Sequence, residues 1–295
     1  MFPPRSVHVV PLPDNRQLHL GARPLVMGVL NVSVDSFAER SACLDSTTAI
    51  EHALRMVDDG ADIIDIGGES SRPGADPVSA SDERARVLPV VKGLAGRIRV
   101  PISVDTYKAD VARDVLAEGA SIINDISGLR YDSGLAGIVA GGAGALVLMH
   151  MRGRAKTMYA EAAYEDVVGE MIDELRASLE VAAAAGVAPA RVIVDPGIGF
   201  AKRSGDSYSV LARLPELAAA LGRPTLVGPS RKSFLSAALG GRPAVERDWG
   251  TAAAVTAAVL AGAHIVRVHA VAEMVQVVRV AEETRRHGLV QTGNA

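Results

Sequence analysis

Polar side chains that could take part in binding or catalysis recur where apolar runs of the 295-residue sequence end. Arg267 and His269 stand two positions apart in HIVRVHA, so a β-strand would present both on one face. The other members of the set are Asn31, Asp65, Asp105, Asn124, His150, Asp195 and the turn Ser230-Arg231-Lys232. Each alone could be a turn former or a helix cap, but the joint pattern of carboxylates, carboxamides and basic groups indicates one site.

Two groups within this set indicate two kinds of ligand chemistry. The acceptor group is Asp105, Asn124 and Asp195, and the basic group is Lys232, Arg267 and His269. Acceptors with added amide donors suit a heterocycle that carries an amino group and ring N–H groups. Clustered basic side chains suit a phosphate-bearing group. The pattern therefore predicts a nitrogen heterocycle bound beside a phosphate.

Eight apolar runs have the composition of parallel β-strands that are buried on both faces. They span residues 25–32, 62–68, 101–106, 121–127, 145–150, 192–197, 225–230 and 264–269. Stretches with helical periodicity lie between them; in residues 46–60, Ser46 can cap a helix and Gly60 can end it. Eight β-then-α units in about 250 residues predict an α/β fold, a single-domain (β/α)8 TIM barrel.

The barrel explains why the polar residues follow the strands. Its active site is built at the carboxyl ends of the strands, and the loops after the seventh and eighth strands often bind phosphate. An open doubly wound sheet is the alternative, although no GxGxxG follows the first strand. We expect residues 1–24 to form an arm or strand pair at the barrel bottom, residues 25–286 the barrel, and residues 287–295 a frayed tail.

The composition limits the classes of partner and location. With 48% hydrophobic residues, 22% charged residues and a formal net charge of −3, no strong bias toward nucleic acid or anionic membrane is expected. The most apolar window, residues 251–263, is shorter than the roughly 18 residues of a membrane span. Cys43 is the only cysteine, which excludes an internal disulfide and favours a reducing, cytoplasmic location.

Three further features are assigned to structure rather than to chemistry. We interpret His150 as a buried histidine satisfied by hydrogen bonds, and the basic segment 151–156 as a solvated loop. Trp249 is expected to pack beside the alanine-rich window.

Seven segments resemble, in order and spacing, the signature segments of the dihydropteroate synthase family. They are MGVLNVSVDSF, IIDIGGESSRPGA, ISVDT, INDISG, DPGIGFAK, VGPSRKSF and RVHAV. The resemblance covers nearly the whole chain. It implies a TIM-barrel transferase of folate synthesis, commonly a homodimer, that joins 6-hydroxymethyl-7,8-dihydropterin pyrophosphate to 4-aminobenzoate. Pyrophosphate leaves early, and the amine attacks a cation-like pterin methylene without a covalent nucleophile.

The same resemblance implies a role for each matching position. Catalysis would fall to the basic group. The pterin pyrophosphate would contact Asp65, Ser71, Asp105, Asn124, Asp195, Lys232, Arg267 and His269, and 4-aminobenzoate would contact Phe37, Ser71, Arg72 and Ser230. Asn31 would lie near a Mg2+ ion bound to the pyrophosphate, which fits the preference of Mg2+ for oxygen ligands.

Two departures from the family pattern leave alternatives open. Val34 replaces a proline in the first loop, which also lacks a glycine pair, and Ala270 replaces a common Asp. The missing carboxylate either oriented His269 or capped a helix. A pterin-binding paralogue with weak or no catalysis therefore remains an alternative. A methyltetrahydrofolate-binding methyltransferase domain would share the acceptor group, but it would have no pyrophosphate for the basic group to bind.

Overall fold

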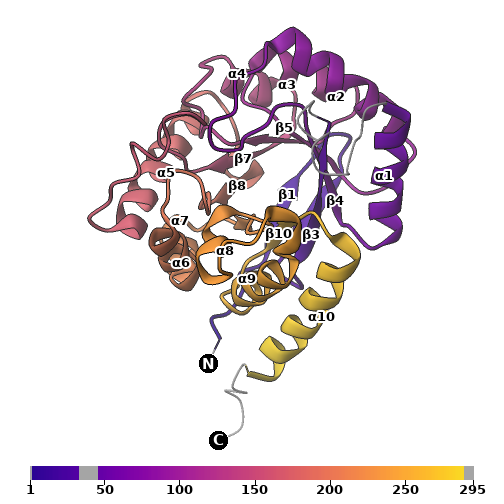
Figure 1. Ribbon diagram of the computed structural model, residues 1–295. Coiled ribbons are helices and arrows are strands. Elements are labelled where there is room, and N and C mark those ends of the chain that lie inside the picture. Colours follow the sequence, from indigo (N-terminus) through magenta and orange to yellow (C-terminus); the bar gives the residue numbers. More distant parts are fainter. Residues whose placement is uncertain (1, 33–45, 289–295) are drawn as a thin grey trace, which may run out of the picture.

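Eight parallel strands form the barrel of the computed structural model, which describes residues 2–32 and 46–288 (Figure 1). They are β3 (Leu25–Asn31), β4 (Ile63–Gly67), β5 (Ile102–Asp105), β6 (Ile122–Asp125), β7 (Ala145–Met149), β8 (Val192–Asp195), β9 (Leu226–Val227) and β10 (Ile265–Val268). The order is β8-β7-β6-β5-β4-β3-β10-β9, and a parallel bridge between Val194 and Thr225 joins the two ends. The predicted (β/α)8 barrel is confirmed.

Helices surround this barrel (Figure 1). They are α1 (Ser46–Asp58), α2 (Ala80–Leu94), α3 (Ala109–Ala117), α4 (Leu135–Gly141), α5 (Val167–Ala184), α6 (Ser204–Ala212), α7 (Leu214–Leu221), α8 (Ser233–Ala238), α9 (Asp248–Leu260) and α10 (Val271–Gly288), with 3-10 turns η2 (Pro189–Arg191) and η3 (Ala244–Glu246). The connections before β9 and β10 each contain two α-helices. Pro215 in the first turn of α7 explains one of these breaks, because proline is tolerated there and not deeper in a helix.

Alternation along the strands decides which side chains enter the barrel. On β4, Ile64 and Ile66 belong to the apolar cluster that packs against the helices, whereas Ile63 belongs to the cluster inside the barrel. The period of two therefore turns Asp65 inward as well. The same argument applies to β10, where Ile265 is inside and Arg267 shares its face.

The residues before the barrel form a hairpin of β1 (His8–Pro11) and β2 (Gln17–Leu20). Its turn residues Asp14 and Asn15 have φ values of 58° and 56°, which suits Asp and Asn in a tight hairpin turn. Val10 and Leu20 share an apolar cluster with the first residues of several barrel strands. The hairpin thus closes the amino-terminal end of the barrel, opposite the predicted site.

Three details differ from the sequence-based expectations. Strand β9 has two residues rather than the predicted run 225–230, and Pro229, which lacks an N–H group, cannot extend the ladder. Helix α10 continues to Gly288, two residues into the expected frayed tail, and Arg285 in its last turn is buried and donates to the carbonyl of Pro3. Trp249 does not pack, because 88% of its surface is exposed at the start of α9.

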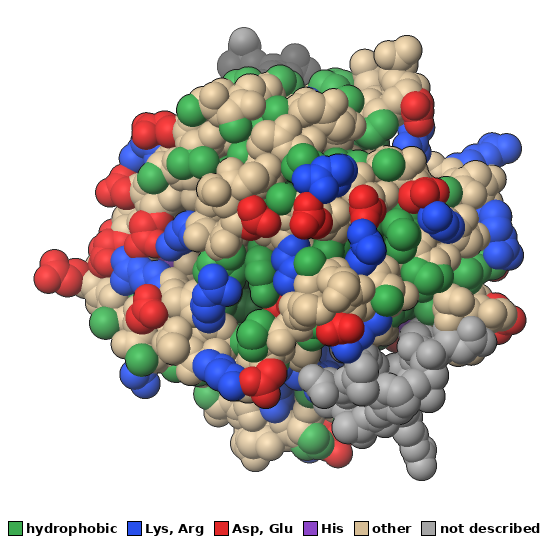
Figure 2. Space-filling model, turned by 90° about the horizontal axis from the view of Figure 1, so that it is seen from above, with side chains coloured by type: hydrophobic (Ala, Val, Ile, Leu, Met, Phe, Trp, Pro, Cys, Tyr) green, Lys and Arg blue, Asp and Glu red, His purple; other side chains and the backbone are tan. Residues whose placement is uncertain are grey.

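Acidic and basic side chains are interspersed over the face shown in Figure 2. Such a mixture is what a small net charge predicts for a protein surface. Within the described ranges, no helix combines the length and the apolar character that a membrane crossing requires.

Candidate active site

A pocket opens at the carboxyl ends of the strands and brings five of the predicted residues together. Its polar lining consists of Asp105, Asn124, Asp195, Lys232 and Arg267, and its remaining lining of Ile126, Met149, Gly197, Ile198, Phe200 and Gly228. Polar groups contributed by five different strands or strand ends therefore share one pocket with apolar side chains. This composition is that of a small-molecule site in which a few polar groups fix the orientation of a flat ligand.

Arg267 is held in a fixed orientation by two carboxylates. Its Nε donates to Asp65 Oδ2 at 2.6 Å, and a terminal nitrogen donates to Asp105 Oδ2 at 3.0 Å. Asn124 Nδ2 also donates to Asp65 Oδ2, at 3.1 Å. We expected Asp65 to contact substrate, but it is fully buried and lies below the pocket lining, where it orients Arg267 and Asn124.

The two remaining carboxyl groups carry perturbed pKa values. Burial raises the pKa of Asp105, and the positive charge of Arg267 opposes that rise. Burial likewise raises the pKa of Asp195, against a hydrogen bond from the backbone N–H of Gly197 at 2.7 Å. Both acids thus exchange protons more readily near neutral pH than exposed acids do, which is common at functional sites.

Lys232 lies over an aromatic ring in the pocket that holds the carboxyl groups. Its Nζ lies 3.5 Å from the centroid of the Phe200 ring, a close cation–π contact. Burial and the charge of Arg267 lower the pKa of Lys232. Phe200 had no assigned role in the sequence analysis, although it lies in the quoted segment DPGIGFAK; only the folded arrangement places its ring under Lys232.

His269 does not contribute the positive charge that we expected. Burial, followed by the charges of Arg267, Arg231, Lys232 and Arg72, lowers its pKa to about 3, so the ring is neutral at neutral pH. Ser230 Oγ accepts from the His269 backbone N–H at 3.2 Å and lies 2.9 Å from Nδ1. The hydroxyl can therefore donate to Nδ1, which leaves Nε2–H as a neutral donor. His269 is not among the residues that line the pocket.

The turn that carries Ser230 and Lys232 is fixed from α9. Arg231 adopts a left-handed conformation with φ of 57°, which is costly for a non-glycine residue. Its backbone N–H donates to Thr251 Oγ1 at 3.0 Å, and its guanidinium forms two 2.7 Å hydrogen bonds with Asp248. These bonds hold a strained turn in the one arrangement that points Lys232 into the pocket.

The loop after β4 lies near the same cluster. Ser71 is half-buried and Arg72 is exposed, and the charge of Arg72 contributes to the lowered pKa of His269. Glu69 accepts from the hydroxyl of Tyr107 at 2.8 Å and so ties this loop to the segment after β5. Phe37, expected in the 4-aminobenzoate site, lies outside the described residues.

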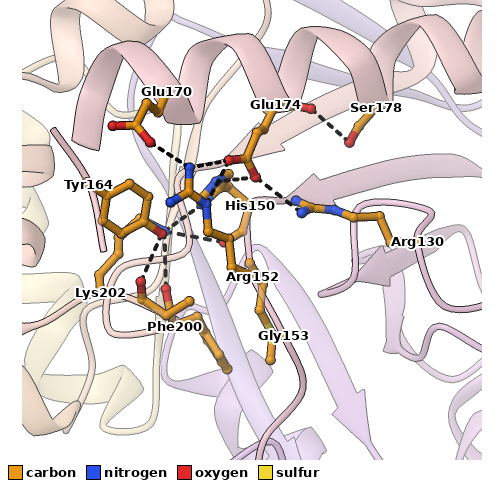
Figure 3. A network of polar contacts seen from close by, with 12 residues as sticks. Arg130, His150, Arg152, Gly153, Tyr164, Glu170, Glu174, Ser178, Phe200 and Lys202 are labelled. Carbon is orange, nitrogen blue, oxygen red and sulfur yellow. Dashed lines mark hydrogen bonds and ion pairs between the residues drawn. The ribbon is translucent and has the colours of Figure 1, made fainter. Parts of the chain in front are cut away.

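The segment after β7 was interpreted only in part correctly. His150 is fully buried and hydrogen-bonded on both ring nitrogens, so its interpretation as a satisfied core histidine is confirmed. Arg152 is not a solvated loop residue: it donates to Glu174 at 2.7 Å and to Glu170 at 2.8 Å, and it stacks on Tyr164 (Figure 3).

Comparison with known proteins identifies what this arrangement belongs to. The sequence matches the family described as pterin binding enzyme over residues 27–269. The dihydropteroate synthase of Synechocystis is 44% identical over 282 residues, covering 95% of each chain. The chain belongs to the dihydropteroate synthase family. The resemblance noted in the sequence is therefore confirmed.

Two solved dihydropteroate synthases have the same fold. The Burkholderia cenocepacia enzyme complexed with 7,8-dihydropteroate is 42% identical, with a TM-score of 0.85 over 96% of this chain and 98% of that one. The Xanthomonas albilineans enzyme with 4-aminobenzoic acid is 39% identical, with a TM-score of 0.85 over 94% of this chain and 98% of that one.

One departure from the family pattern now has a structural context. Ala270 immediately precedes α10, and its carbonyl accepts from the N–H of Met274 at 3.0 Å, as a residue at a helix start does. A carboxylate here would be placed to cap that helix. His269 is instead oriented by Ser230, so this dihydropteroate synthase family member positions its histidine without an acid at position 270.

Proposed function

We propose that this chain catalyses the dihydropteroate synthase reaction. The pterin methylene carbon of 6-hydroxymethyl-7,8-dihydropterin pyrophosphate would lose its C–O bond to pyrophosphate and gain a C–N bond to 4-aminobenzoate. The amine would release one proton. The observation that carries this proposal is the meeting, in one pocket, of the acceptors Asp105 and Asp195 with the cations Lys232 and Arg267.

The acceptor group supports binding of the pterin ring. Carboxylate oxygens of Asp105 and Asp195 can accept from ring N–H and amino groups, and Asn124 can both donate and accept. Ile126 and Met149 line the same pocket and offer an apolar surface for the flat heterocycle. Substrate orientation of this kind supplies much of the rate, because the reacting carbon is then held in one place.

The basic groups support departure of pyrophosphate. Lys232 and Arg267 would stabilise the negative charge that develops as the C–O bond breaks, and neutral His269 would add a hydrogen bond from Nε2. Fixed donors are effective here because no reorganisation is needed during the step. No covalent nucleophile is required for this mechanism.

The 4-aminobenzoate site would lie between the loops after β4, β8 and β9. Phe200 offers an aromatic face, and Lys232 beside it offers a positive charge. We assign the amine-side contacts to these two residues together with Ser71, Arg72 and Ser230. Phe37 stays a prediction of the sequence.

A Mg2+ ion would fit this site only if most of its oxygen ligands came from the substrate. Among the described residues, no group of three or more His, Cys, Asp or Glu side chains could hold a metal. Asn31 Oδ1 approaches the β4 end near Asp105, since both flank Gly67. Asn31 would thus supply one oxygen beside those of the pyrophosphate, and the ion would neutralise that group.

The test is product formation by the purified protein. Pterin pyrophosphate, Mg2+ and 4-aminobenzoate are supplied, with and without the amine, and dihydropteroate and pyrophosphate are measured by chromatography. Amine-dependent dihydropteroate is expected. Tight pterin binding without product would instead favour the binding paralogue and contradict the proposed activity.

The family also implies a homodimer and a cytoplasmic location. The exposed side chains of Val245 in η3 and Trp249 at the start of α9 are compatible with burial against a second subunit. Both statements remain predictions.

A further inference from the structure

A lysine outside the pocket lining is the largest fully buried side chain in the described part of the chain. Lys202 lies in the segment 196–203 that connects β8 to α6, directly after the loop 196–201, and only 1% of its surface is exposed. Burying an amine to this degree costs free energy of folding unless hydrogen bonds replace its lost hydration. Neither the pterin contacts nor the pyrophosphate contacts derived above use it.

The Lys202 amine joins the loop to the end of β7. Its Nζ lies 2.7 Å from His150 Nδ1 and 3.2 Å from the carbonyl oxygen of Phe200 (Figure 3). The carbonyl oxygen of Gly197 is 3.3 Å from the same nitrogen. The N–H of Phe200 donates to the carbonyl of Gly197 at 3.0 Å. Lys202 therefore binds both ends of one tight turn from below.

The charge state of Glu174 determines which atoms donate in these hydrogen bonds. Burial raises the pKa of Glu174, but hydrogen bonds from His150 and Arg152 lower it to about 2. The Glu174 carboxylate is therefore ionised and accepts hydrogen bonds. His150 Nε2, 3.1 Å away, must then carry the proton, and the neutral ring leaves Nδ1 as an acceptor. Lys202 is consequently the donor to His150 as well as to the loop.

The turn held by Lys202 forms one side of the pocket. Gly197, Ile198 and Phe200 all line it. The Phe200 ring supports Lys232, and a Cβ at Gly199 would lie 3.3 Å from Lys232 Cδ. A displacement of this turn would therefore move the aromatic face and the lysine that we assign to the 4-aminobenzoate side.

We propose that Lys202 is a positioning residue for the second substrate: its hydrogen bonds to the 196–201 loop hold Phe200 beneath Lys232 and thereby shape the 4-aminobenzoate pocket. This inference rests on the proposed function for the identity of the second substrate. Its structural part, control of the loop by Lys202, does not. The loop also borders the pterin side of the pocket, where the Gly197 N–H donates to Asp195, so we expect a smaller effect on the pterin substrate.

The first test is Lys202→Met, which keeps an unbranched side chain, one atom shorter than that of lysine, and removes the donors. The KM for 4-aminobenzoate should rise at least about tenfold, whereas the dissociation constant of the pterin substrate should change less than about threefold. Amide hydrogen exchange of residues 196–201, measured without substrates, should accelerate. If Lys202→Met does not fold, Lys202→Gln, which keeps amide donors on a shorter chain, should show a smaller shift of the same kind.

Arg191→Met is the matched control. Arg191 is also a buried basic residue that donates to main-chain carbonyls, those of Ala140 and Gly144 among them, but it precedes β8 at the opposite end of the barrel. The Arg191→Met variant should be less stable than the wild type. Its KM for 4-aminobenzoate, its dissociation constant for the pterin substrate and the amide hydrogen exchange of residues 196–201 should be unchanged.

A double variant tests whether Lys202 acts through the aromatic ring. Lys202→Met and Phe200→Leu together should raise the KM for 4-aminobenzoate by less than the product of their separate effects. Equal effects of Lys202→Met on both substrates, or unchanged exchange of the loop, would overturn the inference. A wild-type protein that forms no dihydropteroate would count against the proposed function, and the exchange measurement would still decide the role of Lys202.

Discussion

Arg267 and Lys232 both direct positive charge into the pocket, but the protein holds them in different ways. Arg267 is clamped between Asp65 and Asp105, which are 0% and 12% exposed at their side chains. Lys232 instead rests on Phe200. The first residue is therefore part of a buried ion network, and the second is a charge presented by a turn.

Replacing each of them separates catalysis from stability. Lys232→Met should lower kcat at least about a hundredfold with little change in unfolding temperature, since one donor to the leaving group is lost. Arg267→Met should also lower kcat, and it should reduce the free energy of unfolding by about 3–5 kcal/mol, because two buried carboxyl groups lose their partner. Thermal unfolding and steady-state kinetics on both variants measure this. Equal stability of the two variants would contradict the clamp.

The backbone conformation of the loop after β8 depends on a glycine. Gly197 has φ of 63°, and a Cβ added there would lie 2.0 Å from the carbonyl oxygen of His150. Glycine is thus required both for its conformation and for its lack of a side chain. The close approach allows the loop to pass under the pocket.

Gly197→Ala should therefore displace this loop. We expect a loss of more than about 2 kcal/mol in the free energy of unfolding, from strain and from the clash, together with weaker 4-aminobenzoate binding. Gly205→Ala in α6 is the control, since nothing lies within 4 Å of the added Cβ; a gain of up to about 1 kcal/mol is expected. Chemical denaturation of both proteins measures the difference. A Gly197 variant as stable as the control would refute the argument.

The sequence alone predicted the strands of the barrel better than it predicted the charge states of the site residues. The eight strands were recognisable because both of their faces are buried, and their polar ends followed from the barrel. The neutral state of His269 was not predictable, because it depends on charges brought from several loops. Phe200 and Arg152 stood in recognised segments, but their contacts with Lys232 and Glu174 cross between different elements. The exposure of Trp249 carries no sequence signal either.

At the scale of the whole molecule, the amino-terminal segment and the last helix are bound together. Arg5 forms a buried ion pair with Glu282 of α10 at 2.8 Å. His264, at the start of β10, connects the same segment to the barrel, with Nε2 lying 3.0 Å from the carbonyl of Ser6 and Nδ1 accepting from the N–H of Thr225 at 3.1 Å. The barrel bottom thus depends on a neutral histidine.

This dependence predicts a sensitivity to acid. Burial lowers the pKa of His264 from 6.5 to about 4. Its stabilising contribution is complete above pH 6.5, where the unfolded chain also carries a neutral ring, and is lost as the pH falls toward 4. The total loss is about 3 kcal/mol. In His264→Gln, the free energy of unfolding should fall less steeply between pH 6.5 and 4.

Denaturant unfolding at several pH values measures this slope. His287→Gln, at an imidazole that is 83% exposed on the last turn of α10, is the control and should keep the wild-type slope. A His264 variant with an unchanged slope would show that other groups govern the acid response.

The exposed Trp249 decides how this protein can be observed in solution. It is the only tryptophan in the sequence, and 88% of its surface is exposed in the single folded chain. Its fluorescence should therefore change little when a single, unassociated subunit unfolds. The same indole stands beside Asp248, which holds the Arg231 turn, so its emission should report a subunit or ligand that covers the start of α9. Intrinsic fluorescence is thus a probe of association for this protein, and folding must be followed by circular dichroism.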